Sequence, residues 1–141
     1  VDAVLVGHGT VVADDPLLTA RPAGPRTAAR VVVTASGDLP ERYQLRATAR
    51  EVPVIVYTTA ANAEKLAGWR ADGADVVALP AGGAGLSPDA VLADLGARRF
   101  TNVLVEGGAG LLGSFLDAKA GDEFHVFVAP KVVGGDRALS P

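Results

Sequence analysis

The chain has 141 residues, of which 49% are hydrophobic and 21% are charged, and its formal net charge is −3. These values are typical of one globular domain, and they exclude both a strongly basic nucleic-acid surface and a dense acidic tail. The absence of cysteine excludes disulfides, a cysteine nucleophile and thiolate zinc ligands. No apolar run approaches the roughly 20 residues of a membrane span. We therefore expect no metal, nucleic acid or membrane among the binding partners.

The first half of the chain alternates short β-rich runs with polar stretches. Residues 3–6 (AVLV) predict a buried strand. Residues 7–29 are rich in glycine and proline and predict a long loop with room for one helical turn. Two further strands are predicted at residues 30–34 (RVVVT) and 53–58 (PVIVYT).

The second half of the chain adds helical patterns between the strands. Residues 63–72 (AEKLAGWRAD) predict a short helix that Gly73 ends, and residues 75–79 (DVVAL) predict a strand. Ser87 as a cap and Pro88 at the first helical position predict a helix that continues to about Arg98. Further along, we expect a strand at residues 102–105 (NVLV), a helix at 109–119 and a strand at 124–128 (FHVFV). Strands that alternate with helices in this way predict an α/β fold with a mainly parallel sheet.

A glycine motif follows one of these strands. Residues 108–113 read GAGLLG, a literal G-x-G-x-x-G that comes directly after NVLV and opens a helix. Backbone N–H groups at such a helix start can hold a phosphate, and glycine lets the phosphate approach closely. A Rossmann site also needs an acidic residue at the end of the next strand, whereas Asp122 and Glu123 precede that strand. Two interpretations stay open on the motif alone: a nucleotide site of another type, or a tight turn without a ligand.

A second group of polar residues follows the first strand. Residues 7–21 read GHGTVVADDPLLTAR and combine glycines, a threonine, two adjacent acids and an arginine. Loops at the carboxyl ends of parallel strands form the ligand crevice of doubly wound sheets. We therefore expect the loops after AVLV and NVLV to face one crevice.

Three segments together resemble the riboflavin-biosynthesis pyrimidine reductases, the C-terminal domain of the bifunctional deaminase–reductase (RibD) family. Residues 7–21 are similar to that family's G-x-G-T-x-x-A-D-D-P-x-L-T-x-R segment, and residues 104–113 to its L-V-E-G-G-x-x-L-x-G segment. Residues 122–134 (DEFHVFVAPKVVG) resemble its D-E-x-x-x-x-x-A-P-K-x-x-G segment. The three motifs occur in the family's order and together span most of the chain.

The resemblance implies a fold and an activity. The fold would be dihydrofolate-reductase-like, with a mainly parallel central sheet and helices on both faces. The activity would be NADPH-dependent reduction of 5-amino-6-(5-phosphoribosylamino)uracil, in which a hydride reaches the sugar C1′ and gives the ribitylamino product. The family also implies a cytoplasmic homodimer. Residues 1–141 would be a single reductase domain without the family's first strand and its C-terminal strands, and the absence of methionine agrees with a piece of something longer.

The resemblance also assigns site residues. Thr10 and Asp14 would contact the nicotinamide side of the cofactor. The turn that holds the cofactor would consist of Gly107, Gly108, Ala109, Gly110, Leu111, Leu112, Gly113 and Ser114. Leu18, Arg21 and Glu106 would contact the substrate, with Asp14 and Glu106 as the catalytic carboxylates.

The chemistry of these residue types agrees with those assignments. Hydride transfer needs positioning and a tuned charge field, but no nucleophile and no metal. The Arg21 guanidinium suits a phosphate or ring carbonyls, although a solvated surface arginine is its alternative. Glu106 suits a helix N-terminus whether or not it binds substrate. Of the adjacent acids, Asp14 is the better candidate for proton transfer near C1′, while both Asp14 and Asp15 could merely cap a turn.

Three basic residues are not expected to act in catalysis or in cofactor binding. The family pattern leaves the position of His8 variable, His125 would point outward from a strand, and Lys131 would be a sheet-end lysine rather than a 2′-phosphate ligand. The family usually has Asp-Ser where this chain has Thr34 and Ala35, which leaves the preference for NADPH over NADH open. Two alternative functions also stay open: a related pteridine, dihydrofolate-type or diaminopyrimidinone reductase, or a non-catalytic nucleotide-binding module.

Overall fold

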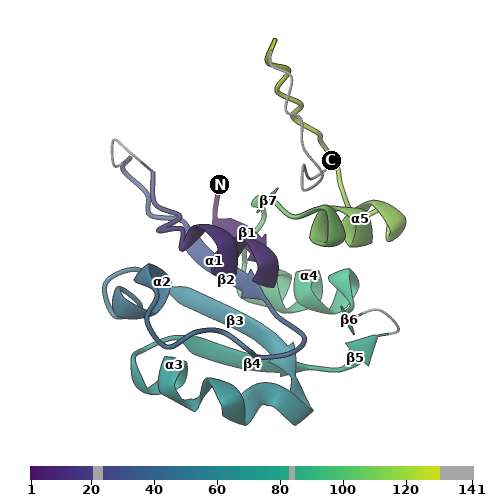
Figure 1. The fold of residues 1–141 in the computed structure, drawn as a ribbon. Helices are drawn as coiled ribbons and strands as arrows, with labels where there is room; N and C mark the ends of the chain where they lie inside the picture. The colour runs from purple at the N-terminus through teal and green to yellow at the C-terminus, as the bar shows by residue number, and fades with distance from the viewer. Residues whose placement is uncertain (21–23, 83–84, 131–141) are drawn as a thin grey trace.

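Five parallel strands form the central sheet of the computed structural model, which describes residues 1–20, 24–82 and 85–130. The spatial order of the strands is β4-β3-β2-β1-β7 (Figure 1). Their bounds are β1 (Ala3–Gly7), β2 (Ala29–Val33), β3 (Val54–Thr59), β4 (Asp75–Leu79) and β7 (Val103–Glu106). All four pairings are parallel. The five corresponding predictions are confirmed to within about one residue at each end, which is the usual uncertainty of element boundaries.

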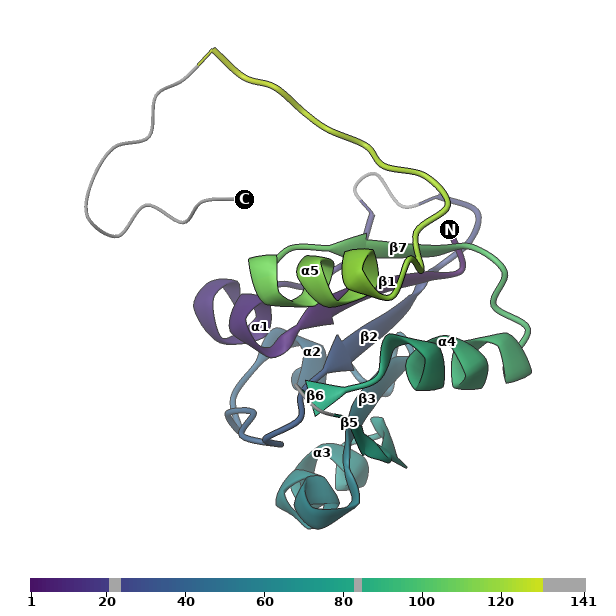
Figure 2. The ribbon, with the colours of Figure 1, turned by 90° about the vertical axis from the view of Figure 1, so that its right-hand side faces the viewer.

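Helices cover both faces of this sheet, as the two views show (Figures 1 and 2). One face carries α1 (His8–Asp14), α2 (Gln44–Ala47), the 3₁₀ helix η1 (Ala60–Leu66) and α3 (Ala67–Ala71). The other face carries α4 (Pro88–Ala97) and α5 (Ala109–Asp117). A short antiparallel pair, β5 (Ala81–Gly82) and β6 (Gly85–Leu86), precedes α4. None of the helices in the described ranges is long and apolar enough to cross a membrane.

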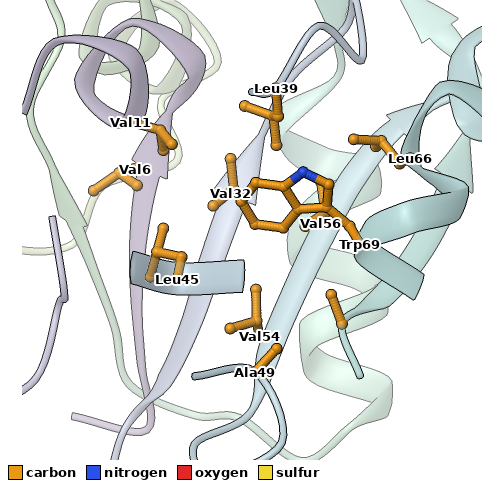
Figure 3. Packing of buried hydrophobic residues seen from close by; sticks show 11 residues of the cluster. Val6, Val11, Val32, Leu39, Leu45, Ala49, Val54, Val56, Leu66 and Trp69 are labelled. Atoms are coloured by element: carbon orange, nitrogen blue, oxygen red, sulfur yellow. The ribbon is translucent and has the colours of Figure 1, made fainter. Parts of the chain in front are cut away.

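The core on the α1–α3 face is built around the single tryptophan of the chain (Figure 3). Trp69 from α3 is 1% exposed and packs over Val32 and Val56, which are partners in the register of β2 and β3. Residues two apart on a strand share a face, so Val54 joins Val56 in the same layer. An aromatic side chain of this size buries a large apolar area. This layer fixes the helices of one face against the strands.

Two helix predictions differ from the structure. The expected loop over residues 7–29 contains α1, because Val11 is fully buried and its packing offsets the helix cost of Gly9. The helix expected over residues 63–72 starts earlier, as the 3₁₀ turns of η1, before it continues as α3. Ser87 does occupy the N-cap of α4 and Pro88 its first turn, but the serine side chain makes no capping hydrogen bond.

The strand expected over residues 124–128 is wrong. These residues form no strand and run away from the domain in both views (Figures 1 and 2). Phe124, Val126, Phe127 and Val128 are exposed, and His125 contacts Glu123 at 3.2 Å instead of projecting from a sheet. An alternating apolar pattern becomes a strand only when a neighbouring strand accepts its backbone hydrogen bonds. Within the part of the chain that the structure describes, the segment pairs with no strand.

The hydroxyl of a buried tyrosine links the sheet to α4. Tyr57 of β3 is fully buried, and its hydroxyl donates to Asp94 Oδ2 at 2.7 Å. Arg98 donates to the same oxygen at 2.6 Å and to Asp75 Oδ2 at 2.6 Å. Burial and the bond to Asp94 both raise the pKa of Tyr57. Partial burial opposes the charged form of Asp94, but the bonds from Tyr57 and Arg98 outweigh it and lower the pKa of that carboxyl.

The hydrogen bonds that Asp94 accepts from Tyr57 and Arg98 predict a contribution to folding stability that is lost at acid pH. Because the folded-state pKa of Asp94 lies below its unfolded value of about 3.8, the contribution is present above that value and lost as the pH falls through the lower folded pKa. We expect Asp94→Asn to cost roughly 1 kcal/mol at pH 7 and to flatten the loss of stability below about pH 4. Urea unfolding between pH 2 and 7 measures this. The exposed Asp122→Asn is the control, and an equal effect of both substitutions would contradict the assignment.

Candidate functional site

The order in which successive strands are added to the sheet reverses between β1 and β7. From β1 the chain adds β2, β3 and β4 on one side, and it then returns to place β7 on the other side of β1. Ligands of open parallel sheets bind at such a switch point, outside the carboxyl ends of the two strands. Val6 pairs with Glu106 there, so the segments that follow β1 and β7 start side by side. The expectation that both loops face one crevice is confirmed in this respect.

Thr10 and Gly107 meet at that switch point. Gly107 has φ +68° and Gly108 φ +74°, which glycine adopts at little cost. A Cβ atom built on Gly107 would lie only 2.9 Å from Thr10 Oγ1. In the described chain, no hydrogen bond of the Thr10 side chain to another residue is found. The geometry therefore leaves a hydroxyl against a backbone turn that has no room for a side chain.

The helix α5 opens directly behind this turn. Gly108 is its N-cap, and no side chain caps the first turn. The first N–H groups of a helix have no partner inside the helix, and the helix dipole favours negative charge at that end. An anion such as a pyrophosphate matches this end, since glycine at the cap leaves the backbone accessible. The residues at this turn thus fit a dinucleotide.

The rest of the glycine motif has a different environment. Added Cβ atoms on Gly110 and Gly113 would meet nothing within 4 Å. Leu111 packs beside Gly7, at 3.5 Å from a Cβ built there, and Ser114 donates to the carbonyl of Leu111 at 2.7 Å. Leu112 is 40% exposed, and Ala109 is exposed beside it. Glycine is therefore favoured at Gly107, just before the motif, and at Gly108, its first residue, but not at Gly110 or Gly113.

A cavity of about 770 Å³ lies next to the turn. Leu18 and Glu106, both expected to contact substrate, line it together. Leu104 and Val4 form part of its floor, because they pair in the register of β7 and β1. The other lining residues are Val1, Thr19, Ala20, Gly24, Pro25, Arg26, Thr27, Ala28 and Val52. The cavity is mainly apolar with a few polar groups, which is typical of small-molecule sites.

The two adjacent acids have separate positions. Asp14 ends α1 one helical turn after Thr10, so the two side chains share a face of the helix, and Asp14 is exposed. Asp15 adopts the left-handed conformation with φ +40°. Its carboxylate accepts from the backbone N–H of Gln44 at 2.8 Å. Asp15 therefore caps α2, whereas the exposed side chain of Asp14 makes no hydrogen bond within the described residues.

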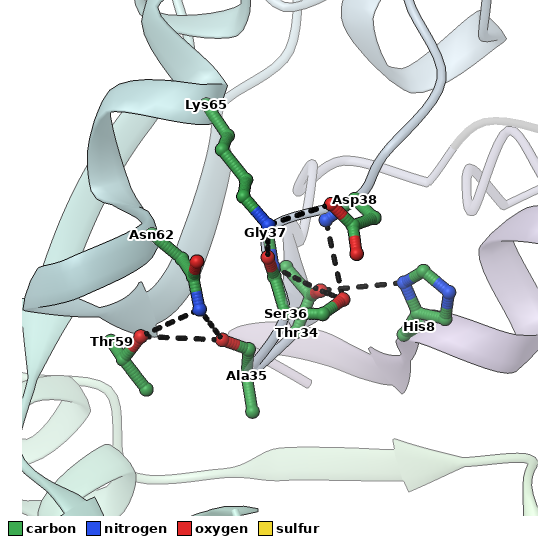
Figure 4. Close-up of polar contacts among 9 residues, drawn as sticks. All are labelled: His8, Thr34, Ala35, Ser36, Gly37, Asp38, Thr59, Asn62 and Lys65. Carbon is green, nitrogen blue, oxygen red and sulfur yellow. Dashed lines mark hydrogen bonds and ion pairs between the residues drawn. The ribbon is translucent and has the colours of Figure 1, made fainter.

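The turn after β2 forms a polar cluster at the same edge of the sheet (Figure 4). Thr34 Oγ1 lies 3.3 Å from His8 Nδ1 and accepts from the N–H of Gly37 at 3.1 Å. Lys65 Nζ donates to Asp38 Oδ1 at 2.9 Å and to the carbonyl of Ser36 at 3.0 Å. The hydrogen bond and charge of Lys65 lower the pKa of the Asp38 carboxyl. His8 is thus part of a polar turn, and the ammonium of Lys65 is already engaged.

Two residues named from the sequence lie outside the described residues, namely Arg21 and Lys131. The neighbours Ala20 and Gly24 do line the cavity. Of the cavity wall, only Leu18 and Glu106 were named from the sequence as site residues, and the polar residues Arg26 and Thr27 lie outside all three family motifs. They lie in a stretch rich in proline and glycine whose pattern predicts only a loop, so no sequence signal placed them at the site.

The whole chain, residues 1–141, matches the family model described as the RibD C-terminal domain. The chain belongs to the RibD C-terminal domain family. Residues 104–113 of this family member thus carry the motif that the sequence resemblance indicated. The expected relationship is confirmed.

Two curated proteins are similar to this RibD C-terminal domain over nearly its full length. It is 32% identical over 139 residues to the riboflavin biosynthesis protein RibD of Actinobacillus pleuropneumoniae, covering 99% of this chain and 37% of that protein. It is 31% identical over 137 residues to a 2,5-diamino-6-ribosylamino-4(3H)-pyrimidinone 5′-phosphate reductase of Aquifex aeolicus, covering 96% of this chain and 60% of that protein. The chain therefore spans between about a third and three fifths of the length of these two relatives.

Solved structures are similar as well. A Thermotoga maritima diaminohydroxyphosphoribosylaminopyrimidine deaminase/5-amino-6-(5-phosphoribosylamino)uracil reductase matches with TM-score 0.66 and 31% identity, over 83% of this chain and 30% of that one. RibD of Acinetobacter baumannii matches with TM-score 0.72 and 24% identity, over 95% of this chain and 36% of that one. These likenesses confirm the dihydrofolate-reductase-like fold class of this RibD C-terminal domain.

Proposed function

We propose that this domain binds NADPH at the Thr10–Gly107 turn and reduces 5-amino-6-(5-phosphoribosylamino)uracil to its ribitylamino product. The observation that carries the proposal is the contact of Thr10 with Gly107, where the turn has no room for a side chain. This turn opens α5 and borders the cavity that holds Leu18 and Glu106. A reduced nicotinamide bound there would supply a hydride. The membership in the RibD C-terminal domain family supports this assignment.

The cofactor and the substrate would bind in two neighbouring regions of the domain. Residues 107–114 would hold the dinucleotide by backbone N–H groups, with Thr10 and Asp14 beside the nicotinamide. Leu18, Arg21 and Glu106 would hold the pyrimidine and the sugar phosphate. Leu18 and Glu106 share one cavity, so a substrate bound between them would present its sugar toward the turn. Positioning of this kind lowers the barrier of hydride transfer without a nucleophile.

The two carboxylates would handle charge and protons. Asp14 lies one helical turn from Thr10 and would transfer a proton as the sugar ring opens at C1′. Glu106 follows Val105 at the end of β7 and would accept hydrogen bonds from sugar hydroxyls or ring N–H groups. A hydride from the bound dinucleotide would go to C1′, and a proton from solvent would go to the adjoining nitrogen, which would give the ribitylamino group. We further propose that the domain acts as a cytoplasmic homodimer.

A diaminopyrimidinone 5′-phosphate is the second candidate substrate. A relative that is 31% identical carries the name of a reductase for that compound. Leu18 and Leu104 of the cavity wall would offer only apolar surface to either ring, so they would not separate the two substrates. Competition between the two substrates for turnover separates them, since the true substrate will have the larger kcat/KM.

Direct titration with NADPH and with NADH tests the cofactor assignment. We expect NADPH to bind in the micromolar range, which corresponds to about −8 kcal/mol. NADPH differs from NADH by a 2′-phosphate, which a lysine could bind. The ammonium of Lys65 in the turn after β2 is already bonded to Asp38. We therefore expect the preference for NADPH over NADH to be modest, about tenfold or less. Calorimetry measures both dissociation constants. Binding of NADPH without turnover of either pyrimidine would favour the non-catalytic nucleotide-binding alternative, and binding of neither dinucleotide would contradict the proposal.

A further inference from the structure

A charged side chain lies in the interior of the domain, on the sheet face that bears α1 and α2. Arg30 of β2 is fully buried. No ion pair involves it among those found in the described residues. Burial lowers the pKa of its guanidinium and the charge of Glu51 raises it, and an arginine remains protonated in such a setting. A buried charge without a carboxylate partner is costly, so its hydrogen bonds must serve a purpose.

The guanidinium joins three separate segments. Its Nη1 donates to Thr48 Oγ1 at 2.6 Å and, more weakly, to the carbonyl of Leu17 at 3.4 Å. Its Nη2 donates to the carbonyls of Thr48 at 3.0 Å and Val52 at 2.5 Å. Thr48 is the C-cap of α2, where the helix dipole favours a cation. Arg30 thus connects α2 and the start of β3 to the loop that follows α1.

Helix α2 and its N-cap also hold the last turn of α1 and the loop that follows it. The Tyr43 hydroxyl donates to the carbonyl of Val12 at 3.1 Å. The side-chain amide of Gln44 donates to the carbonyl of Asp15 at 2.6 Å, and its backbone N–H donates to the Asp15 carboxylate. Residues 12–17 are therefore bonded to α2 or to Arg30 at Val12, Asp15 and Leu17. Asp14 lies inside this segment, and Leu18 follows it.

Leu18 needs such support because its backbone is strained. Its φ is +53°, a left-handed conformation that a leucine adopts only at a cost of about 1–2 kcal/mol. The surrounding structure must hold a residue of this kind in place. The Leu17 carbonyl belongs to the peptide group that precedes Leu18, so its bond to Arg30 restrains that peptide. The Leu18 side chain packs partly on the core and lines the cavity.

We propose that Arg30 is a positioning residue for the cavity: through the Leu17 carbonyl and α2 it fixes residues 12–18, so that Leu18, which lines the cavity, stays in place for the substrate. Arg30 lines no part of the cavity among the residues found there, so it acts through the loop. The statement about the loop stands on the described contacts, whereas the statement about substrate rests on the proposed function.

Hydrogen exchange tests the part that concerns the loop. Arg30→Met removes the charge and all four bonds while keeping an apolar stem, and Arg30→Lys keeps a charge that cannot span three segments at once. Arg50→Met is the matched control, because Arg50 also donates to a carbonyl, that of Ala71 at 2.8 Å, but away from this loop. We expect amide exchange of residues 12–18 to accelerate about tenfold or more in both Arg30 variants and to stay unchanged in the control.

Steady-state kinetics tests the part that concerns substrate, on the same variants in the full-length protein. We expect the KM for the pyrimidine to rise about tenfold, with kcat changed less and the NADPH dissociation constant within about twofold of wild type. A merely structural residue would accelerate exchange throughout the domain and leave KM unchanged. Either that pattern, or unchanged exchange of residues 12–18, would overturn the proposal. If the wild type turns over no pyrimidine, the proposed function fails, while the exchange data still decide the role of Arg30 in the loop. Arg30→Lys decides both questions if Arg30→Met does not fold.

Discussion

Gly108→Asp is expected to weaken NADPH binding about 100-fold, which corresponds to a loss of roughly 2.7 kcal/mol. Gly108 is the N-cap of α5, and its φ of +74° places the backbone of the turn beside Thr10. Any side chain at this positive φ strains the turn, and this strain is shared by other substitutions of similar shape. The carboxylate of aspartate would, in addition, stand where the cofactor phosphates are expected, and like charges in contact cost several kcal/mol.

Gly108→Asn is the matched control for this prediction. Asparagine has nearly the same shape, tolerates positive φ as well as aspartate does, and carries no charge. We expect it to weaken binding by no more than about tenfold. Raising the salt concentration should recover part of the loss in the aspartate variant alone, because salt screens the repulsion. Equal effects of the two substitutions would mean that shape, and not the charge of a bound phosphate, decides at this position.

The second large effect is expected at the carboxylates. Glu106→Gln keeps the size of the side chain and removes its charge, so the wall of the cavity stays in place. Hydrogen bonds to a charged group contribute about 1.5–3 kcal/mol each. We therefore expect kcat/KM for the pyrimidine to fall by about 10- to 100-fold, while the NADPH dissociation constant changes little. Coupled measurement of turnover by NADPH absorbance and of binding by calorimetry separates the two quantities.

Two further variants make this prediction sharp. Glu64→Gln is the control, because Glu64 is 88% exposed and contacts only Arg70 at 3.8 Å within the described residues. Asp14→Asn should lower kcat more than it changes KM, since Asp14 is assigned to proton transfer. Full turnover in Asp14→Asn would remove Asp14 from the mechanism. Full turnover in Glu106→Gln would mean that the cavity beside β7 is not where the substrate reacts.

The five strands of the central sheet could be predicted from local pattern alone. Runs such as Val54–Thr59 are continuous and apolar, as strands covered on both faces are. Only a single helical turn could be predicted where α1 lies, because Gly7 and Gly9 favour a loop and only the burial of Val11 against the sheet extends the helix. The segment of residues 124–128 has a good strand pattern, but a pattern does not supply the neighbouring strand that would pair with it.

The site could be predicted in part. Because the segments that follow β1 and β7 both leave the carboxyl ends of parallel strands, the sequence predicted that they face one crevice, and Leu18 and Glu106 do share a cavity. The role of Arg30 could not be predicted, because a charged residue at the start of an apolar strand is usually a solvated strand end. Its bonds reach residues 17, 48 and 52, and only the tertiary structure brings those carbonyls together.

The most direct test of the central claim is a titration of the isotope-labelled protein with NADPH, followed by amide chemical shifts. The account predicts that the largest shifts occur at Thr10 and at the first amides of α5, from Gly107 to Leu111, and that the Gly108→Asp variant loses them. Saturable NADPH binding that leaves these amides unchanged and shifts residues elsewhere would contradict the assignment of the Thr10–Gly107 turn as the cofactor site.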